Sequence, residues 1–254
     1  MSDRDEVVQR LTEQLDQAAG LRELAKIAPE AGAARLSLRA WQGGRLARTH
    51  ADLLASPHFG RAASFFLSDI YGLTDLSKRD AAIKRIVPIM IRLLPLAGLE
   101  TVADAVELDA LSEALDAAMV AALGPRVALV DAKSYARAYR QVGRRESRER
   151  QIELIAHLGY ALDRLARQPF IGATLAMMRR PAKLMGLKDL QDVLERGYEA
   201  VRGVEDIDTF LELIVSRERH LLRALFAGDD TLLLAEESRF KSSPRIETSR
   251  GSTR

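Results

Sequence analysis

The chain has 254 residues, of which 47% are hydrophobic and 29% are charged, so it can bury a core without a disulfide or a metal. It contains no cysteine, which excludes thiol nucleophiles, disulfides and cysteine-ligated metal centres. Aromatic residues make up only 5%, and the formal net charge is +2. This composition is typical of helices that pack through aliphatic side chains, and the balanced charge gives no indication of nucleic-acid binding.

The first residues include Asp3, Arg4, Asp5 and Glu6, where a secretory signal would carry basic residues followed by an apolar run. The longest apolar stretches of the chain are far shorter than the roughly 18 residues that a membrane helix needs. We therefore expect a cytoplasmic protein that does not insert into a membrane.

Apolar residues three and four positions apart predict a first helix over 6–27, which Pro29 ends. This N-terminal segment, residues 1–30, is expected to lie at the periphery of the domain. The same spacing predicts a second helix over 34–55.

A third helix is predicted over 57–71, with Gly72 as its left-handed cap. A fourth helix is predicted over 78–94. Pro88 lies inside it and removes one backbone hydrogen bond, so we expect a kink at that residue.

Residues 99–123 form the longest predicted helix, with apolar residues facing inward and acids outward, and Gly124 ends it. The apolar run 127–130 is interpreted as a buried linker, because a lone strand would have no partner. Asp131 and Asp206 mark the starts of two later helices. The remaining helices are predicted over 132–142, 146–167, 169–179, 187–202 and 207–227.

Residues 169–178 are apolar on nearly all sides, so we expect them to form a central helix of the core. Methionines in this segment would give an adaptable lining for an apolar ligand. Gly159 and Gly172 lie in predicted helices, where glycine is unfavourable. They predict close packing between helices, with room for a ligand as the alternative.

These patterns predict an all-α fold: a compact bundle of roughly nine helices, one of them kinked at Pro88. We expect a single domain over 1–236. Residues 237–254 are polar and carry few apolar anchors, so they are predicted to form a disordered tail.

Three strings, FFLSDIYG, SKRDAAIKRIVPIMIRLLP and RQPFIGATLAMMRRPAKLMGL, resemble an uncharacterised bacterial family of helical proteins. The resemblance covers most of residues 36–227. It implies no activity, cofactor or substrate.

Asp69 lies within FFLSDIYG, the most aromatic stretch of the chain. A buried carboxylate must be paired, because isolated burial costs several kcal/mol. We therefore expect Asp69 to form a structural ion pair or a capping contact, and a catalytic role is the alternative.

The four histidines do not occur in a metal-binding spacing, and the nearest approach is Glu153 with His157, four residues apart. Such a pair is usually a boundary contact. We expect no bound metal and no cofactor.

The densest charged segment runs from Arg137 to Arg150 and contains six arginines and two glutamates. Binding of phosphate or a nucleic-acid backbone is one interpretation of this run. A solvated helix junction with paired charges is the favoured one, because the acids dilute the positive field.

A ligand site is predicted between 65–71, the helix kinked at Pro88 and 169–178. Kinks and small residues leave gaps between helix ridges, and two arginines at the mouth would bind an acidic head group. The candidate residues are Phe65, Phe66, Asp69, Tyr71, Phe170, Met177, Met178, Arg179 and Arg180.

The leading interpretation is a non-enzymatic helical domain that binds a protein partner, a second copy of itself, or a small apolar, amphipathic or acidic ligand. The first alternative is a metal- or haem-dependent enzyme of the heme-oxygenase-like or ferritin-like kind. Its pocket would be lined by His50, Asp69, Glu107 or His157. The second alternative is phosphate or nucleic-acid binding through the run Arg137 to Arg150.

Overall fold

The computed structural model describes residues 2–27, 29–70, 87–88, 91–92, 94–184 and 186–242. All regular structure in these residues is helical, which confirms the all-α fold. They contain eleven α-helices, somewhat more than the nine expected. One addition arises from a break after Thr49, which divides the predicted helix 34–55, and another is a helix at 231–242.

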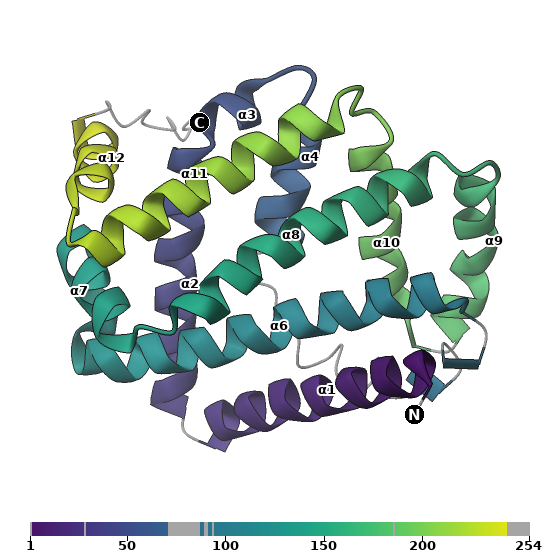
Figure 1. Ribbon diagram of the computed structural model, residues 1–254, viewed down its shortest axis with the longest axis horizontal. Coiled ribbons are helices and arrows are strands. Elements are labelled where there is room, and N and C mark those ends of the chain that lie inside the picture. The colour runs from purple at the N-terminus through teal and green to yellow at the C-terminus, as the bar shows by residue number, and fades with distance from the viewer. Residues whose placement is uncertain are drawn as a thin grey trace, which may run out of the picture.

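The first half contains α1 (Asp3–Ile27), α2 (Pro29–Thr49), α3 (Ala51–Ala55), α4 (Gly60–Phe65), the π-helical turn η1 (Phe66–Ile70) and α6 (Leu96–Leu123). The second half contains the 3-10 helix η2 (Gly124–Leu129), α7 (Ala132–Val142), α8 (Arg145–Ala166), α9 (Ile171–Leu184), α10 (Lys188–Val201), α11 (Ile207–Ala227) and α12 (Thr231–Ser242). The long helices α1, α6, α8 and α11 run across the molecule, with α9 and α10 at one end and α7 and α12 at the other (Figure 1). None of the described helices is long and apolar enough to cross a membrane.

Several helix ends follow from local chemistry. The carboxylate of Asp131 accepts a hydrogen bond from the backbone N–H of Ser134 at 2.8 Å, and Asp206 caps α11 through Thr209 at 2.9 Å. Gly124, with φ of 59°, follows the last residue of α6. The three predicted boundaries are therefore confirmed.

Two predictions, the disordered tail and the kink at Pro88, concern segments that the structure describes only in part. Helix α12 extends to Ser242, so the predicted disordered tail is helical over 237–242, and 243–254 lie outside the described residues. Leu233 of α12 is buried in a cluster with side chains of α2, α7 and α11, which explains why this segment folds. The kink predicted at Pro88 falls on a segment of which only isolated residues are described.

Close helix packing at Gly159 is confirmed. A Cβ atom on this residue would lie only 2.5 Å from Leu211 of α11. Glycine thus lets α8 and α11 approach each other in the central cluster, which also contains Leu154, Ile155 and Phe210.

The prediction that 169–178 is a central core helix is wrong. Only Ala182 of α9 is buried, whereas Met177 is 78% and Leu184 is 89% exposed. Phe170, just before the helix, is 81% exposed. The reason is that α9 packs along α10 on one side, at the end of the molecule, and the described residues leave its outer side open (Figure 1).

The prediction that the acids of α6 face outward is wrong for Glu113 and Asp116. Glu113 is 1% exposed and accepts hydrogen bonds from Arg22 Nε at 3.1 Å, Arg35 Nη1 at 2.6 Å and Arg39 Nη2 at 2.6 Å. Asp116 of α6 is buried as well and accepts from Arg39 Nε at 2.8 Å. Ion pairing with α1 and α2 explains how these acids are tolerated inside.

A third acid of α6, Glu107, connects α1 with α8. Glu107 accepts a hydrogen bond from Arg150 Nε of α8 at 2.7 Å and from Arg10 Nη1 of α1 at 2.8 Å. Arg150 and then Arg10 lower the pKa of Glu107 against the opposing effect of partial burial. Helix α1, which we expected to be peripheral, also contributes Leu11 and Leu15 to a buried cluster with α6.

We expect Glu113→Gln to lower the free energy of unfolding by about 3–5 kcal/mol, because it leaves buried guanidinium groups without their carboxylate. Chemical denaturation measures the change. The matched control is Glu149→Gln, which removes an exposed pair with Arg145 and should cost about 0–1 kcal/mol. Equal losses of unfolding free energy in the two variants would show that the ion pairs of Glu113 do not hold the fold together.

Candidate functional site

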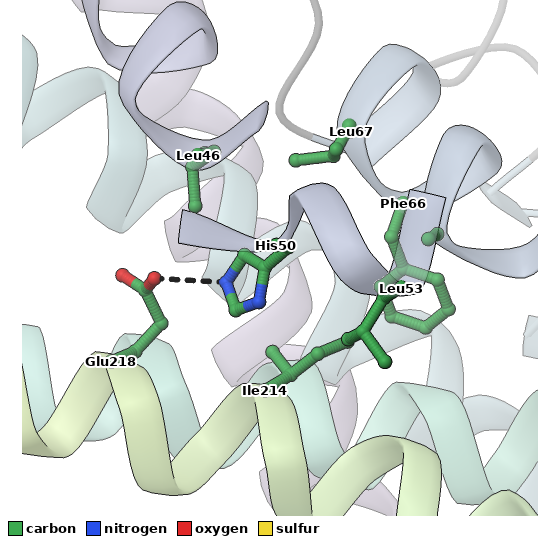
Figure 2. Close-up of a pocket in the computed structure, with 8 residues that line it drawn as sticks. Leu46, His50, Leu53, Phe66, Leu67, Ile214 and Glu218 are labelled. Carbon is green, nitrogen blue, oxygen red and sulfur yellow. Dashed lines mark hydrogen bonds and ion pairs between the residues drawn. The ribbon is translucent and has the colours of Figure 1, made fainter. Parts of the chain in front are cut away.

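A small cavity lies where α2 and α3 meet η1 and α11 (Figure 2). Its volume of about 20 Å³ gives room for roughly one water molecule, not for an apolar ligand. Its lining residues are Leu46, His50, Leu53, Ala63, Phe66, Leu67, Ile214 and Glu218.

The polar group of this cavity is built around Glu218 of α11. Its Oε1 atom accepts hydrogen bonds from Arg45 Nη1 at 2.5 Å and from His50 Nε2 at 3.1 Å, and all three residues are buried. Burial alone would raise the pKa of Glu218, but Arg45 and His50 together lower it to about 2. The carboxylate is therefore ionised, and His50 Nε2 is the nitrogen that donates.

The other ring nitrogen of His50 is buried, and no described residue donates a hydrogen bond to it. Figure 2 shows this side of the ring turned toward Leu53 and Ile214, away from Glu218. The buried Nδ1 atom of His50 thus has no hydrogen-bond partner among the described residues, and the cavity beside it has the size of a water molecule. This geometry suits a small polar molecule such as water and leaves no room for an organic substrate.

The FFLSDIYG stretch supplies part of the cavity wall. Its Phe66 and Leu67 belong to η1, and π-helical turns often occur at functional sites. The side chain of Asp69 and all of Tyr71 lie outside the described residues. The expected ion pair or cap of Asp69 therefore stays a prediction.

The other predicted site residues separate into two groups. Phe65 and Phe66 are buried, and a Cβ atom on Gly197 of α10 would lie 2.9 Å from the Phe65 ring. Phe170 and Met177 are exposed with α9, on the other side of α10. The described residues do not bring the two groups to one pocket.

Helix α9 carries an exposed stripe along its outer side, which we call the α9 stripe. Three large apolar side chains recur at intervals of seven residues, and smaller or polar ones lie between them at the same face. The α9 stripe consists of Phe170, Ala173, Thr174, Met177, Arg180, Pro181 and Leu184, all of them exposed.

The inner side of α9 is held by α10. A Cβ atom on Gly172 would lie 2.8 Å from the hydroxyl of Tyr198, which confirms close packing at this predicted position. Gln191 donates from Nε2 to the carbonyl oxygen of Leu175 at 2.7 Å. These contacts fix the direction in which the α9 stripe faces.

An ion pair adds to this attachment. Arg179 donates from Nε to both carboxylate oxygens of Glu195, at 2.8 and 2.9 Å. Arg179 and then Gln191 lower the pKa of Glu195 to about 2. Arg179, a predicted ligand-binding residue, is thus engaged by α10, whereas Arg180 and Met178 are exposed.

Phe170 has a strained backbone, with φ of 68°. This left-handed conformation costs a residue with a bulky side chain roughly 1–2 kcal/mol. Strained residues concentrate at functional positions, because elsewhere a glycine would be more stable. The strain holds an aromatic ring in solvent at the start of the α9 stripe.

Four of the six arginines in the run Arg137 to Arg150 make structural contacts: Arg140, Arg145, Arg148 and Arg150. Arg140 pairs with Asp230 at 2.5 Å, and Arg150 pairs with α6. The guanidinium carbon of Arg148, a buried residue, lies 3.6 Å from the centre of the Tyr139 ring. This arrangement agrees with the favoured interpretation of a helix junction with paired charges.

Of the residues named for the enzyme alternative, His50 lies beside α11, whereas Glu107 and His157 lie at the contact of α6 with α8. His50 pairs with Glu218, Glu107 pairs with two arginines, and His157 is exposed on α8. Among the described residues, no group of three or more histidines and acids gathers as a set of metal ligands.

We expect Glu218→Gln to lower the free energy of unfolding by about 3 kcal/mol at pH 7, because it leaves Arg45 buried without its anion. The folded pKa near 2 lies below the ordinary value of 4.5, so this contribution is complete above about pH 5. It is lost as the pH falls toward 2, and the difference from the wild type should shrink over that range. Denaturation at several pH values measures it.

The control for this prediction is Glu212→Gln, an exposed glutamate on the same helix. It should change stability by less than about 0.5 kcal/mol at every pH. A constant difference between wild type and Glu218→Gln from pH 7 to pH 3 would contradict the ion pair.

Comparisons with known proteins identify a family for the chain but no activity. No curated protein and no solved structure matches the chain. Residues 21–232, from the last turns of α1 to the start of α12, match a family described as "Domain of unknown function (DUF8198)". That span includes Glu113 with its three arginine partners, the cavity and the α9 stripe, and the chain belongs to this family.

Proposed function

We propose that this chain is a non-enzymatic interaction domain that binds a protein partner through the α9 stripe. The observation that carries the proposal is that large apolar side chains lie on the outer side of α9, which no described residue covers, whereas α10 covers the inner side. A helix that is apolar all round is normally buried on all sides. A partner that covers the outer side would resolve this mismatch.

The gain from such a cover is substantial. Phe170, Met177 and Leu184 are each at least 78% exposed. Moving a side chain of this size from water into a packed interface stabilises by about 1.5–3 kcal/mol. Three neighbouring anchors of this kind are typical of the central part of a protein interface.

The shape of the surface favours a protein over a small molecule. Small ligands bind in concave pockets, whereas the α9 stripe lies along the outside of a helix. A second helix that packs against the stripe would meet its anchors at the intervals of seven. The cavity beside His50 has room for roughly one water molecule and supports a ligand-binding role less well.

We expect a photo-crosslinking amino acid at position 177 to give a discrete crosslinked product in living cells, because the partner covers Met177. The control carries the crosslinker at Leu129, which is 82% exposed on another part of the surface. Mass spectrometry identifies the peptides in the product.

The product should disappear when Phe170→Ser and Leu184→Ser are added to the chain that carries the crosslinker. Both positions are exposed, so these changes should shift stability by less than about 0.5 kcal/mol each. The proposal would be overturned if the crosslinker gave the same crosslinked products at position 177 as at position 129.

We expect Phe170→Gly to stabilise the isolated protein by about 1 kcal/mol, because glycine adopts φ of 68° without strain and little burial is lost. The same variant should lose the crosslink from position 177. Arg144→Gly is the matched control, since Arg144 also has positive φ, 53°, but lies at the start of α8. It should gain stability and keep the crosslink, and a loss of stability in Phe170→Gly would show that the ring is needed for the fold.

A further inference from the structure

We infer that the partner of the α9 stripe is an amphipathic helix of another protein that carries carboxylates along one edge of its apolar face. This inference rests on the proposed function and names the chemistry of the partner. It follows from how charge is distributed around the α9 stripe.

One edge of the α9 stripe is basic. Arg180 belongs to the stripe, and Lys183 follows three residues later on the same side of the helix. Both are exposed, and neither has an ion pair within the described part of the chain. The nearby Arg179 is neutralised by Glu195, so two cations are left for a partner.

The opposite edge of the α9 stripe is apolar. Met178, 43% exposed, and Ile171, half-buried, flank it there. A complementary helix therefore needs acids on one edge only, with apolar side chains across the rest of its face. Charge complementarity of this kind fixes the orientation of the partner as well as its affinity.

A second copy of this chain matches the surface less well. Two antiparallel α9 helices related by a two-fold axis would pack Met177 against its counterpart. The same axis would place both basic edges on one side of the pair, with Arg180 and Lys183 of each copy close together. Like charges at an interface oppose association.

A membrane surface also matches less well. Electrostatic attachment to anionic lipid normally needs a cluster of about four to eight basic residues. The α9 stripe and its basic edge offer two cations, Arg180 and Lys183, within a chain whose net charge is only +2. The observations therefore favour an acidic helix over a lipid surface.

The test uses the full chain and two labelled peptides of about 18 residues, or five helical turns. Both carry a leucine face, and one has glutamates and the other lysines along one edge. At a salt concentration of about 50 mM, fluorescence anisotropy should show that the glutamate peptide binds about tenfold more tightly than the lysine peptide. This preference should diminish at about 300 mM salt.

The charge-reversed variant Arg180→Glu with Lys183→Glu should prefer the lysine peptide. The matched control, Lys133→Glu with Arg137→Glu, changes the net charge equally at exposed positions of α7 and should keep the preference for glutamate. Met177→Ser should weaken the binding of both peptides. Circular dichroism checks that each variant keeps its helices.

Three outcomes would overturn the inference. The first is equal binding of the two peptides by the wild type, which would leave the proposed function intact if the crosslink from position 177 is observed. The second is binding of phosphatidylglycerol vesicles that Arg180→Glu with Lys183→Glu abolishes, without discrimination between the peptides. The third is self-association in sedimentation that Met177→Ser abolishes, again without discrimination.

Discussion

The packing of this fold depends on buried and partly buried carboxylates of α6 that pair with arginines from three other helices. Glu113 binds α1 and α2 together, and Glu107 joins α1 to α8. A buried ion pair adds little to stability compared with apolar packing, but its loss leaves a charge in a poorly solvated site. Alternative arrangements of the helices that separate Glu113 from its arginines are therefore disfavoured by several kcal/mol. Pairing thus specifies which helices surround α6, while the apolar clusters provide most of the driving force.

The position of α9 is set through α10. On one side of α10, Gly197 allows the Phe65 ring to approach the backbone, and on the other Tyr198 packs into the space that Gly172 leaves. Consecutive close contacts of this kind place α9 one layer further from the core than the central helices. The α9 stripe consequently faces outward from a support that is itself well packed. A surface held in this way needs little reorganisation when a partner binds, which lowers the entropic cost of association.

Periodicity and turn chemistry predicted the helical class, the caps at Asp131 and Asp206, and the end of α6 at Gly124, because these features depend on residues within one or two turns. The acids of α6 were placed outward, since the pattern along a helix does not show whether an arginine elsewhere will reach an acid. Arg22 and Glu113 are 91 positions apart in the chain. The break after Thr49 was missed for a related reason, because apolar spacing continues across it and tertiary packing decides where the helix stops.

The candidate site was predictable only in part. Phe66 lines a cavity with residues of α2, α3 and α11, not the expected one with 169–178. The pairing of His50 with Glu218 there joins residues 168 positions apart that no local motif connects. The error at α9 has a different physical origin. A helix with apolar residues on all sides is expected to be covered on all sides, but the pattern does not show which molecule provides the cover. We expected the rest of the chain to cover α9 on all sides, whereas the residues that the structure describes leave the outer side open. The proposal that a partner covers the outer side of α9 follows from this error, because the apolar side chains there have no cover among the described residues.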